Sequence, residues 1–259
     1  MDYIDITAII NLHREGILAH ASILSLAQAK SRAEQNGIRI ETLALLDNAN
    51  EITSEIIENW TLAGLRTIHV EEGDLGEARN RGVREARGEW IAFLDADDFW
   101  GEFWLLTAYA AACRDLREIV WHPDVNLYFG IDAHLFRHID MEDPQFDPLS
   151  LLLSNYWTSL CFARRSLLNE VPYRRISLTD QIGYEDWAWN IETIGRGVLH
   201  KIVPGTAHAI RIKPNSLRQK TSALRALPYP SPLFRTNVIG SRGSSSPRFR
   251  ATSPPISVS

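Results

Sequence analysis

One stretch, residues 76–98 with the sequence GEARNRGVREARGEWIAFLDADD, constrains the fold of this chain more than any other. Residues 78–86 are rich in helix formers and carry arginines on their polar side, which predicts a helix that Gly88 terminates. Residues 90–94 (WIAFL) form a short continuous apolar run, typical of a strand that is covered on both faces of a mixed or parallel sheet. The stretch therefore predicts a helix followed directly by a buried strand.

Three carboxylates, Asp95, Asp97 and Asp98, follow the end of this strand. Carboxylates at the mouth of a buried strand are costly to leave unpaired, so they should meet water, a cation or a basic partner. In open α/β sheets this edge is where ligands bind. The spacing does not fit a helix–loop–helix calcium site, and the sequence has no GxxxxGK[ST] motif of a P-loop ATPase. The remaining alternative is a solvated turn in which an Asp caps a helix that begins near Trp100.

The first hundred residues alternate between strand and helix patterns. Before the stretch described above, strands are predicted at residues 4–10, 38–46 and 65–70, and helices at residues 17–35 and 51–63. This alternation predicts an α/β domain with a doubly wound mixed sheet flanked by helices.

The remainder of the chain is less regular. Its patterns predict helices at residues 103–113 and 186–194, a short helix opening near 150–153, and strands at 118–121, 125–129, 160–163 and 198–203. From Thr236 the composition changes to Ser, Pro and Arg with few core-forming residues. Such a segment cannot bury enough apolar surface to fold, which predicts a disordered tail over residues 236–259.

Composition excludes several classes of protein. The net charge of −5 and the pI near 5.9 argue against a nucleic-acid partner. Cys113 and Cys161 lie in apolar surroundings without CxxC spacing, which predicts buried free thiols in a reducing compartment. The sequence shows no signal-peptide pattern, and no apolar run approaches the roughly 20 residues that span a bilayer. We therefore expect a soluble, cytoplasmic protein with at most peripheral membrane association.

Residues 78–100, ARNRGVREARGEWIAFLDADDFW, closely resemble the family 2 glycosyltransferases, which use nucleotide sugars and have the GT-A fold. The pattern of that family runs from ARNxGxxxARGE through a hydrophobic strand to LDxDD and an aromatic residue. A weaker resemblance extends over most of residues 4–217. It implies a single GT-A catalytic domain at residues 1–235, with a nucleotide-sugar-binding half at 1–100 and an acceptor-side half at 101–235.

The resemblance implies that the carboxylates after the strand bind the sugar donor. In the family the DxD aspartates hold a divalent cation that bridges the diphosphate of the donor. Asp97 is the expected ligand of Mn²⁺ or Mg²⁺, and Asp95 is the second ligand, placed to face the ribose or the sugar. Hard oxygen ligands suit these ions, which often use one or two carboxylates together with phosphates. Asp98 could instead cap the next helix.

Four further residues are implied to contact the donor. In NLHRE, His13 takes the place of the usual aromatic residue of the family and would stack on the nucleobase. In LDNAN, Asp47 is all that remains of a DDGS-like turn and would accept a hydrogen bond from the base. An ordinary polar loop and a turn or helix N-cap remain alternatives for these two positions. Arg79 would approach the phosphates or the base, and Arg211 in RIKPNSL would close over the diphosphate.

Glu185 and Asp186 match the ED pair that begins a helix in the acceptor site of the family. The resemblance favours Asp186 as the general base, with Glu185 orienting the acceptor or capping the helix. Complementing the helix dipole is the alternative role for two adjacent acids at a helix start. The QxxRW motif of processive members is missing after this pair, which indicates transfer of a single sugar. Acceptor contacts are expected within residues 144–173.

Together these features predict an inverting, metal-dependent, non-processive glycosyltransferase. It would move one sugar from a nucleotide diphosphate sugar, expected to be UDP-linked, to a hydroxyl of a saccharide or lipid-linked acceptor in cell-surface polysaccharide or glycoconjugate synthesis. The inverting outcome follows from the resemblance alone. A nucleotidyltransferase is one alternative, although residues 11–16 lack its usual glycine-rich basic loop. A catalytically inactive GT-A-like binding or scaffold protein is the other, because NLHRE and LDNAN depart from the family pattern.

Overall fold

The structure is a computed structural model that describes residues 3–60, 64–214 and 216–230. The predicted tail at 236–259 lies outside the described residues, as do positions 61–63 at the end of the helix predicted over 51–63. Within the described residues, no helix is both long enough and apolar enough to cross a bilayer.

The first part of the chain alternates between strands and helices, as predicted. The elements in order are β1 (Ile6–Leu12), α1 (Leu18–Glu34), β2 (Ile40–Asp47), α2 (Glu51–Asn59), β3 (Leu65–Val70), α3 (Leu75–Glu85) and β4 (Trp90–Asp95). The four strands are parallel and lie in the order β3-β2-β1-β4. Because the order reverses at β1, the carboxyl ends of β1 and β4 form a switch point where ligands bind in sheets of this kind.

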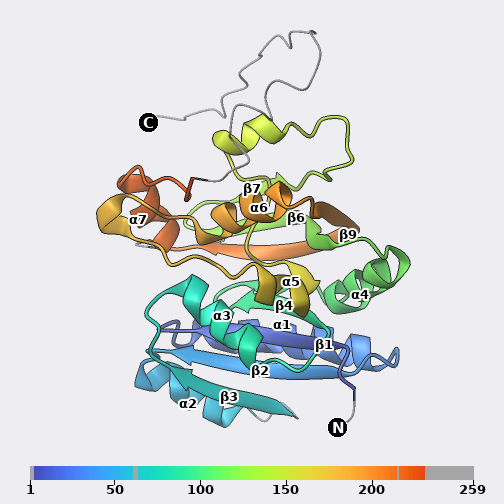
Figure 1. The fold of residues 1–259 in the computed structure, drawn as a ribbon. Helices are drawn as coiled ribbons and strands as arrows, with labels where there is room; N and C mark the ends of the chain where they lie inside the picture. The colour runs from blue at the N-terminus through green and yellow to red at the C-terminus, as the bar shows by residue number, and fades with distance from the viewer. Residues whose placement is uncertain (1–2, 61–63, 215, 231–259) are drawn as a thin grey trace, which may run out of the picture.

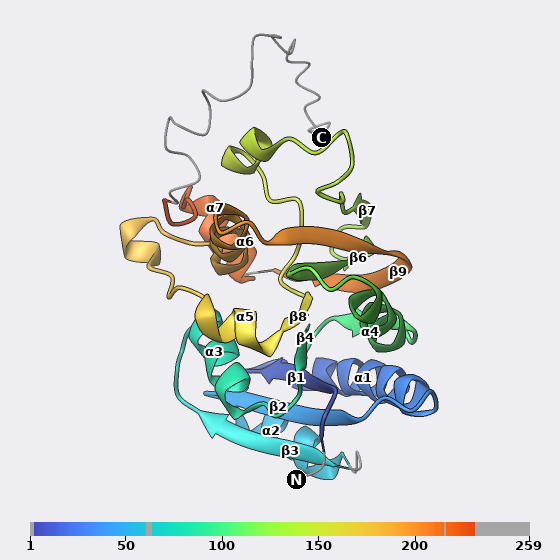
Figure 2. The same ribbon diagram turned by 45° about the vertical axis from the view of Figure 1, so that its right-hand side comes forward.

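The second part of the chain extends the same sheet. Its elements are β5 (Phe99–Trp100), α4 (Trp104–Arg114), β6 (Ile119–Gly130), β7 (His134–Arg137), η1 (Pro148–Leu152), β8 (Phe162–Arg164), α5 (Arg165–Glu170), η2 (Leu178–Asp180), α6 (Glu185–Gly195), β9 (Leu199–Ile212) and α7 (Leu217–Ala223). Strand β8 pairs antiparallel with β4 and joins it to β6 and β9. Figures 1 and 2 show β1–β3 at one end of the molecule and β6, β9 and α7 at the other.

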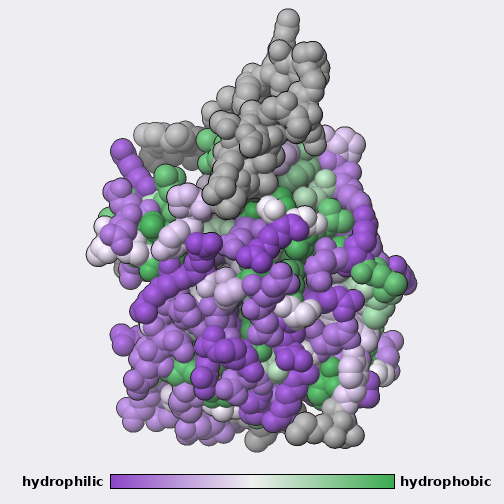
Figure 3. Space-filling model, in the orientation of Figure 1, coloured by the Kyte–Doolittle hydropathy of each residue, from purple (hydrophilic) through white to green (hydrophobic). Residues whose placement is uncertain are grey.

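Helices cover both faces of the sheet, and each face has its own core. The first core packs α1 and α4 against one face, and the second packs α3 and α5 against the other. Strand β1 contributes to both cores because its side chains alternate between the faces: Ile10 belongs to the first core and Ile9 to the second. The surface view in Figure 3 is accordingly mostly hydrophilic over the lower half of the molecule.

Three local predictions are wrong in detail. Gly88 does not terminate the helix, because α3 already ends at Glu85; a Cβ atom on Gly88 would lie 2.4 Å from the backbone nitrogen of Thr7, so close packing on β1 requires this glycine. The strands predicted at 118–121 and 125–129 form one strand, β6, with a register shift between Pro123 and Val125. Cys161 is buried as expected, but Cys113 is exposed; both are free thiols.

Candidate functional site

Parallel pairing brings three of the predicted site residues to one edge of the sheet. His13 directly follows β1, and Asp47 and Asp95 are the last residues of β2 and β4. Asn11 of β1 is paired in register with Asp95 of β4. Positions that are 34 residues apart (His13 and Asp47) and 84 residues apart (Asn11 and Asp95) in this way become neighbours at the carboxyl ends of the strands.

His13 and Asp47 both have defined partners at this edge. The exposed His13 ring lies with Nδ1 2.5 Å from the backbone oxygen of Asp47. The Asp47 carboxylate accepts hydrogen bonds from the backbone nitrogens of Glu72 and Gly73, at 2.8 and 3.0 Å, and therefore holds the loop before α3. The alternative that Asp47 caps α2 is wrong, since Asn50 is the N-cap of that helix.

Strand β9 holds the loop that carries the three aspartates. The Arg211 backbone nitrogen donates to Asp98 Oδ1 at 2.7 Å, and Arg211 Nε donates to the backbone oxygen of Asp97 at 3.2 Å. Asp98 is buried and does not cap α4, which begins at Trp104. Burial raises the pKa of Asp98 well above its usual value, and the neighbouring charges of Asp97 and Asp95 raise it further.

Lys213, which the sequence analysis did not single out, forms an ion pair with the expected metal ligand. Its Nζ atom lies 2.5 Å from Asp97 Oδ2. The half-buried ammonium has a raised pKa even though burial opposes it, because Asp97 accepts its hydrogen bond and attracts its charge. The available signal was a lysine two residues after Arg211 in a segment already expected to close over the diphosphate.

Arg79 has a different environment from the one expected of a donor-binding residue. Its side chain is completely buried, with 0% of its surface exposed. Nη1 donates to Glu185 Oε1 at 2.8 Å, and Nη2 donates to both carboxylate oxygens of Asp95 at 3.1 Å. Arg79 therefore joins a carboxylate of the DxD motif to one of the ED pair, and it has no exposed surface with which to contact a donor.

The Arg79 pairing separates the roles of the two acids that begin α6. Both line the pocket, but Glu185 is buried against Arg79, whereas Asp186 accepts a hydrogen bond from Asn155 Nδ2 at 3.4 Å. The pKa of Asp186 is raised to about 7, mainly by burial and also by the neighbouring charge of Glu185, while the positive charge of Arg79 opposes both effects. A carboxylate whose pKa lies near neutrality is suited to accept a proton.

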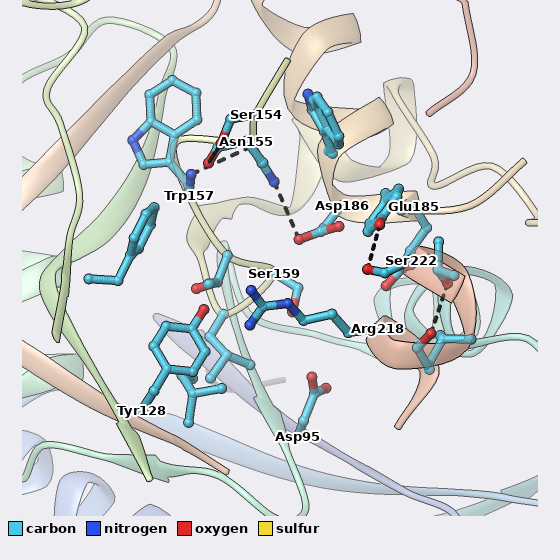
Figure 4. Close-up of a pocket in the computed structure, with 18 of the residues that line it drawn as sticks. Asp95, Tyr128, Ser154, Asn155, Trp157, Ser159, Glu185, Asp186, Arg218 and Ser222 are labelled. Carbon is cyan, nitrogen blue, oxygen red and sulfur yellow. Dashed lines mark hydrogen bonds between the residues drawn. The ribbon is translucent and has the colours of Figure 1, made fainter. Parts of the chain in front are cut away.

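The pocket beside Asp186 has a volume of about 460 Å³ and reaches from the aspartate loop to α7 (Figure 4). Its walls include the aromatic rings of Tyr128, Trp157 and Trp187 and the side chains of Ser159 and Arg218. Residues 153–160, which fall within the segment expected to contact the acceptor, form one side of it. Aromatic walls with a few polar groups are typical of a saccharide-sized binding site.

The carboxylates of Asp95 and Asp97 have the ligand chemistry that a divalent cation requires. Asp95 and Asp97 are partly exposed, with 23% and 13% of their side-chain surface accessible, and they present the oxygen ligands that Mg²⁺ and Mn²⁺ prefer. Within the described ranges no group of three or more His, Cys, Asp or Glu side chains is arranged to hold a metal by itself. A cation here would thus need further ligands, such as the phosphates of a nucleotide.

Comparison with solved structures defines the class of fold. The chain superposes on S. aureus TarS 1-349 with a TM-score of 0.58 and 16% identity, covering 80% of this chain and 60% of TarS 1-349. It superposes equally well, with a TM-score of 0.58, on the mannosyltransferase PcManGT from Pyrobaculum calidifontis in complex with GDP-Man and Mn²⁺, at 15% identity, covering 85% of this chain and 60% of that one. The predicted GT-A fold of the glycosyltransferases is confirmed.

Sequence comparison then identifies the family. The model of glycosyl transferase family 2 matches residues 17–171, more than half of the chain, and the chain belongs to this family. Two Bacillus subtilis (strain 168) relatives are similar over shorter segments. The protein named "Uncharacterized glycosyltransferase EpsJ" is 39% identical over 62 residues, and the one named "Putative glycosyltransferase EpsH" is 36% identical over 72 residues. These matches cover 23% and 27% of this chain and only about a fifth of each relative, 18% and 21%.

Proposed function

We propose that this protein is a glycosyltransferase that moves one sugar from a nucleotide diphosphate sugar to a hydroxyl group of an acceptor. The observation that carries the proposal is the buried Arg79, which links Asp95 of the DxD motif to Glu185 of the ED pair. Through this link, Asp95 and the residue next to the candidate base Asp186 are held together, and both Asp95 and Asp186 line the same pocket. Family membership and the GT-A fold support the same reaction.

Asp186 is the proposed general base. An acceptor hydroxyl is a poor nucleophile, and it must lose its proton while the bond to the sugar forms. Asp186 lines the pocket and accepts a hydrogen bond from Asn155 there, whereas Glu185 is paired with Arg79, and the pKa of Asp186 near 7 lets it hold that proton after transfer. Inversion at the anomeric carbon, with the acceptor attacking opposite the leaving diphosphate, is the proposed stereochemistry.

Asp97 and Asp95 are the proposed ligands of Mn²⁺ or Mg²⁺, which when bound would neutralise charge on the leaving diphosphate. Lys213 and Arg211 supply positive charge beside the same loop. His13 at the end of β1 is proposed to contact the nucleobase, and Asp47 to position the loop that borders it. Two neighbouring folds are described in complex with UDP-GlcNAc and with GDP-Man and Mn²⁺, which supports a nucleotide sugar as donor.

The proposal further takes UDP as the donor nucleotide, a saccharide or lipid-linked acceptor, and a cytoplasmic reaction that transfers one sugar at a time in cell-surface polysaccharide or glycoconjugate synthesis. The absence of QxxRW after Glu185-Asp186 supports the non-processive assignment. The EpsJ and EpsH similarities support a glycosyltransferase but specify neither sugar nor acceptor.

The test is donor cleavage by the purified protein with Mn²⁺ and UDP-GlcNAc, UDP-glucose or GDP-mannose. A glycosyltransferase releases a nucleoside diphosphate, either by slow hydrolysis or by transfer to an added saccharide. Release of pyrophosphate from a sugar phosphate and a nucleoside triphosphate would instead identify a nucleotidyltransferase. Binding of a nucleotide sugar with no release of either product would leave the binding or scaffold protein as the correct assignment.

A further inference from the structure

Arg218 of α7 is the basic side chain of the pocket that the proposed reaction does not use. In Figure 4 its guanidinium reaches into the pocket between Asp186 and Asp95, in front of Tyr128 and Ser159. Its centre lies 5.5 Å from the centroid of the Tyr128 ring. A guanidinium over an aromatic face is attracted to the ring but keeps its N–H groups free to donate at its edge.

The carboxylates that share the pocket are engaged elsewhere. Asp95 and Glu185 pair with Arg79, and Asp98 accepts the backbone N–H of Arg211. Asp186 receives its hydrogen bond from Asn155. Among the residues that the structure describes, no carboxylate lies within ion-pair distance of Arg218, although four line the same pocket. The guanidinium is therefore available to an anionic group of a ligand.

Close packing fixes the position of α7, and hence of Arg218, relative to the ED pair. Gly183 lies against this helix so tightly that a Cβ atom there would meet Thr221 Cγ2 at 2.3 Å. Tyr184 and Ser222 are joined through their hydroxyl groups at 2.9 Å. Since both contacts involve the two residues that precede Glu185-Asp186, the base and the cation belong to one packed unit.

We propose that Arg218 binds a phosphate or carboxylate group of the acceptor, so that the acceptor is an anionic saccharide or glycoconjugate. This inference rests on the proposed function, because it takes Asp186 as the base. The donor diphosphate is the competing ligand for the same guanidinium. The acceptor is favoured because the aspartate loop already has the ammonium of Lys213, whereas Arg218 lies over Tyr128 of β6 beside Ser159. A guanidinium can bind either oxyanion in a bidentate manner.

The experiment measures binding of glucose 6-phosphate, glucuronate and glucose by calorimetry, to the protein alone and to the protein with UDP and Mn²⁺. We expect the two anionic probes to bind at least about tenfold more tightly than glucose, since a charge-assisted hydrogen bond contributes roughly that factor. Arg218→Ala should remove the preference, and Arg218→Lys should keep part of it. Lys220→Ala, which removes a charge from the same helix outside the pocket, should keep all of it.

Three results would overturn the proposal: equal binding of all three probes by the parent, a preference that survives in Arg218→Ala, or a loss of the preference in Lys220→Ala. A fourth would be weakening of UDP binding by Arg218→Ala to the same extent as probe binding, which would assign the residue to the donor diphosphate. Failure of the proposed function has a different signature, because the parent would then release no nucleoside diphosphate from a nucleotide sugar, while the probes still report on Arg218.

Discussion

The proposed donor edge of the sheet, which carries Asp47, Asp95 and Asp97, and the pocket beside α6 hold their polar groups in different ways. At the donor edge each carboxylate has a strong partner: Asp47 accepts backbone N–H groups, Asp95 pairs with Arg79, and Asp97 pairs with Lys213. In the pocket, Asp186 accepts a hydrogen bond from Asn155 at 3.4 Å but forms no ion pair with any described residue, and Arg218 lies over the ring of Tyr128.

This difference indicates how the work of the reaction is divided. Carboxylates that are held by partners before a substrate arrives keep their oxygen atoms in fixed positions, as the proposed cation site requires. Groups with few partners can change protonation state or accept a ligand, as a base and an acceptor site must. Arg79 is the boundary between the two regions, since it contacts one carboxylate of each.

The largest effect is expected from removing the proton acceptor of the pocket. Asp186→Asn should lower sugar transfer by roughly a hundred- to ten-thousand-fold, the usual contribution of a positioned base, while UDP binding measured by calorimetry stays within about twofold. In the parent, kcat/KM should rise with pH through about 7, because only the ionised form of Asp186 accepts the proton.

Glu185→Gln serves as the matched variant for this comparison. It should reduce transfer less than Asp186→Asn, because Glu185 is engaged by its ion pair with Arg79. Full loss of transfer in Glu185→Gln together with retained activity in Asp186→Asn would reverse the two roles. If both variants kept their transfer activity, Glu185 and Asp186 would have only a structural role at the start of α6.

Replacing Arg79, which contacts both regions, is expected to lower the free energy of unfolding. Arg79→Met leaves Asp95 and Glu185 without their cation, and removing one partner of a buried ion pair typically costs about 3 kcal/mol or more. Arg81→Met is the control, since Arg81 forms a surface pair with Glu85 and should change the unfolding free energy by less than about 0.5 kcal/mol. Urea unfolding followed by tryptophan fluorescence measures both, and equal values for the two variants would refute the structural role of Arg79.

Asp97→Asn tests whether the donor edge holds a cation. The substitution keeps the size of the side chain and removes its charge, so Mn²⁺-dependent binding of UDP should weaken by at least about tenfold with an unchanged melting temperature. Binding of UDP without metal is the internal control and should change little. Unaltered Mn²⁺-dependent affinity in the variant would remove Asp97 from the metal site.

A smaller effect is expected on the pH dependence of stability. The pKa of Asp186 is about 7 in the folded protein and about 4 in an unfolded chain, so the stabilisation present when both states are protonated is lost as pH rises from about 4 through 7. Asp186→Asn removes this loss. Relative to the parent, the variant should gain roughly 1 kcal/mol of unfolding free energy between about pH 5 and pH 8, allowing for partial solvent screening in the pocket. A pH-independent difference would contradict the raised pKa.

The smallest expected effect concerns the surface near the pocket. From Thr193 to the end of the sequence there are eleven Lys or Arg residues and no Asp or Glu, although the whole chain is acidic. Residues that line the pocket also expose leucines, among them Leu153 and Leu217. We expect weak, salt-sensitive binding to vesicles that contain anionic lipid, and about tenfold less to neutral vesicles. The double substitution Lys220→Glu with Arg225→Glu should weaken binding to the anionic vesicles, which sedimentation with vesicles would measure.

The sequence by itself determined the fold class, the family and the chemical character of the two acidic motifs. These follow from local patterns: an apolar strand followed by aspartates, and an acidic pair at a helix start. Their spacing and neighbouring residues were sufficient because both motifs are short and contiguous, and the family and GT-A fold they predicted are confirmed.

Only the tertiary structure decided how these motifs meet. Arg79 looked like a donor-binding residue, but it contacts Glu185, which is 106 residues away, and is buried by that contact. Arg218 carried no distinguishing local signal, and Lys213 had only its place two residues after Arg211. Both residues gain their positions from the tertiary structure, Lys213 beside Asp97 and Arg218 through the packing of α7. Burial and ion pairing depend on which distant segments the fold brings together, and no local pattern in a single sequence specifies that partner.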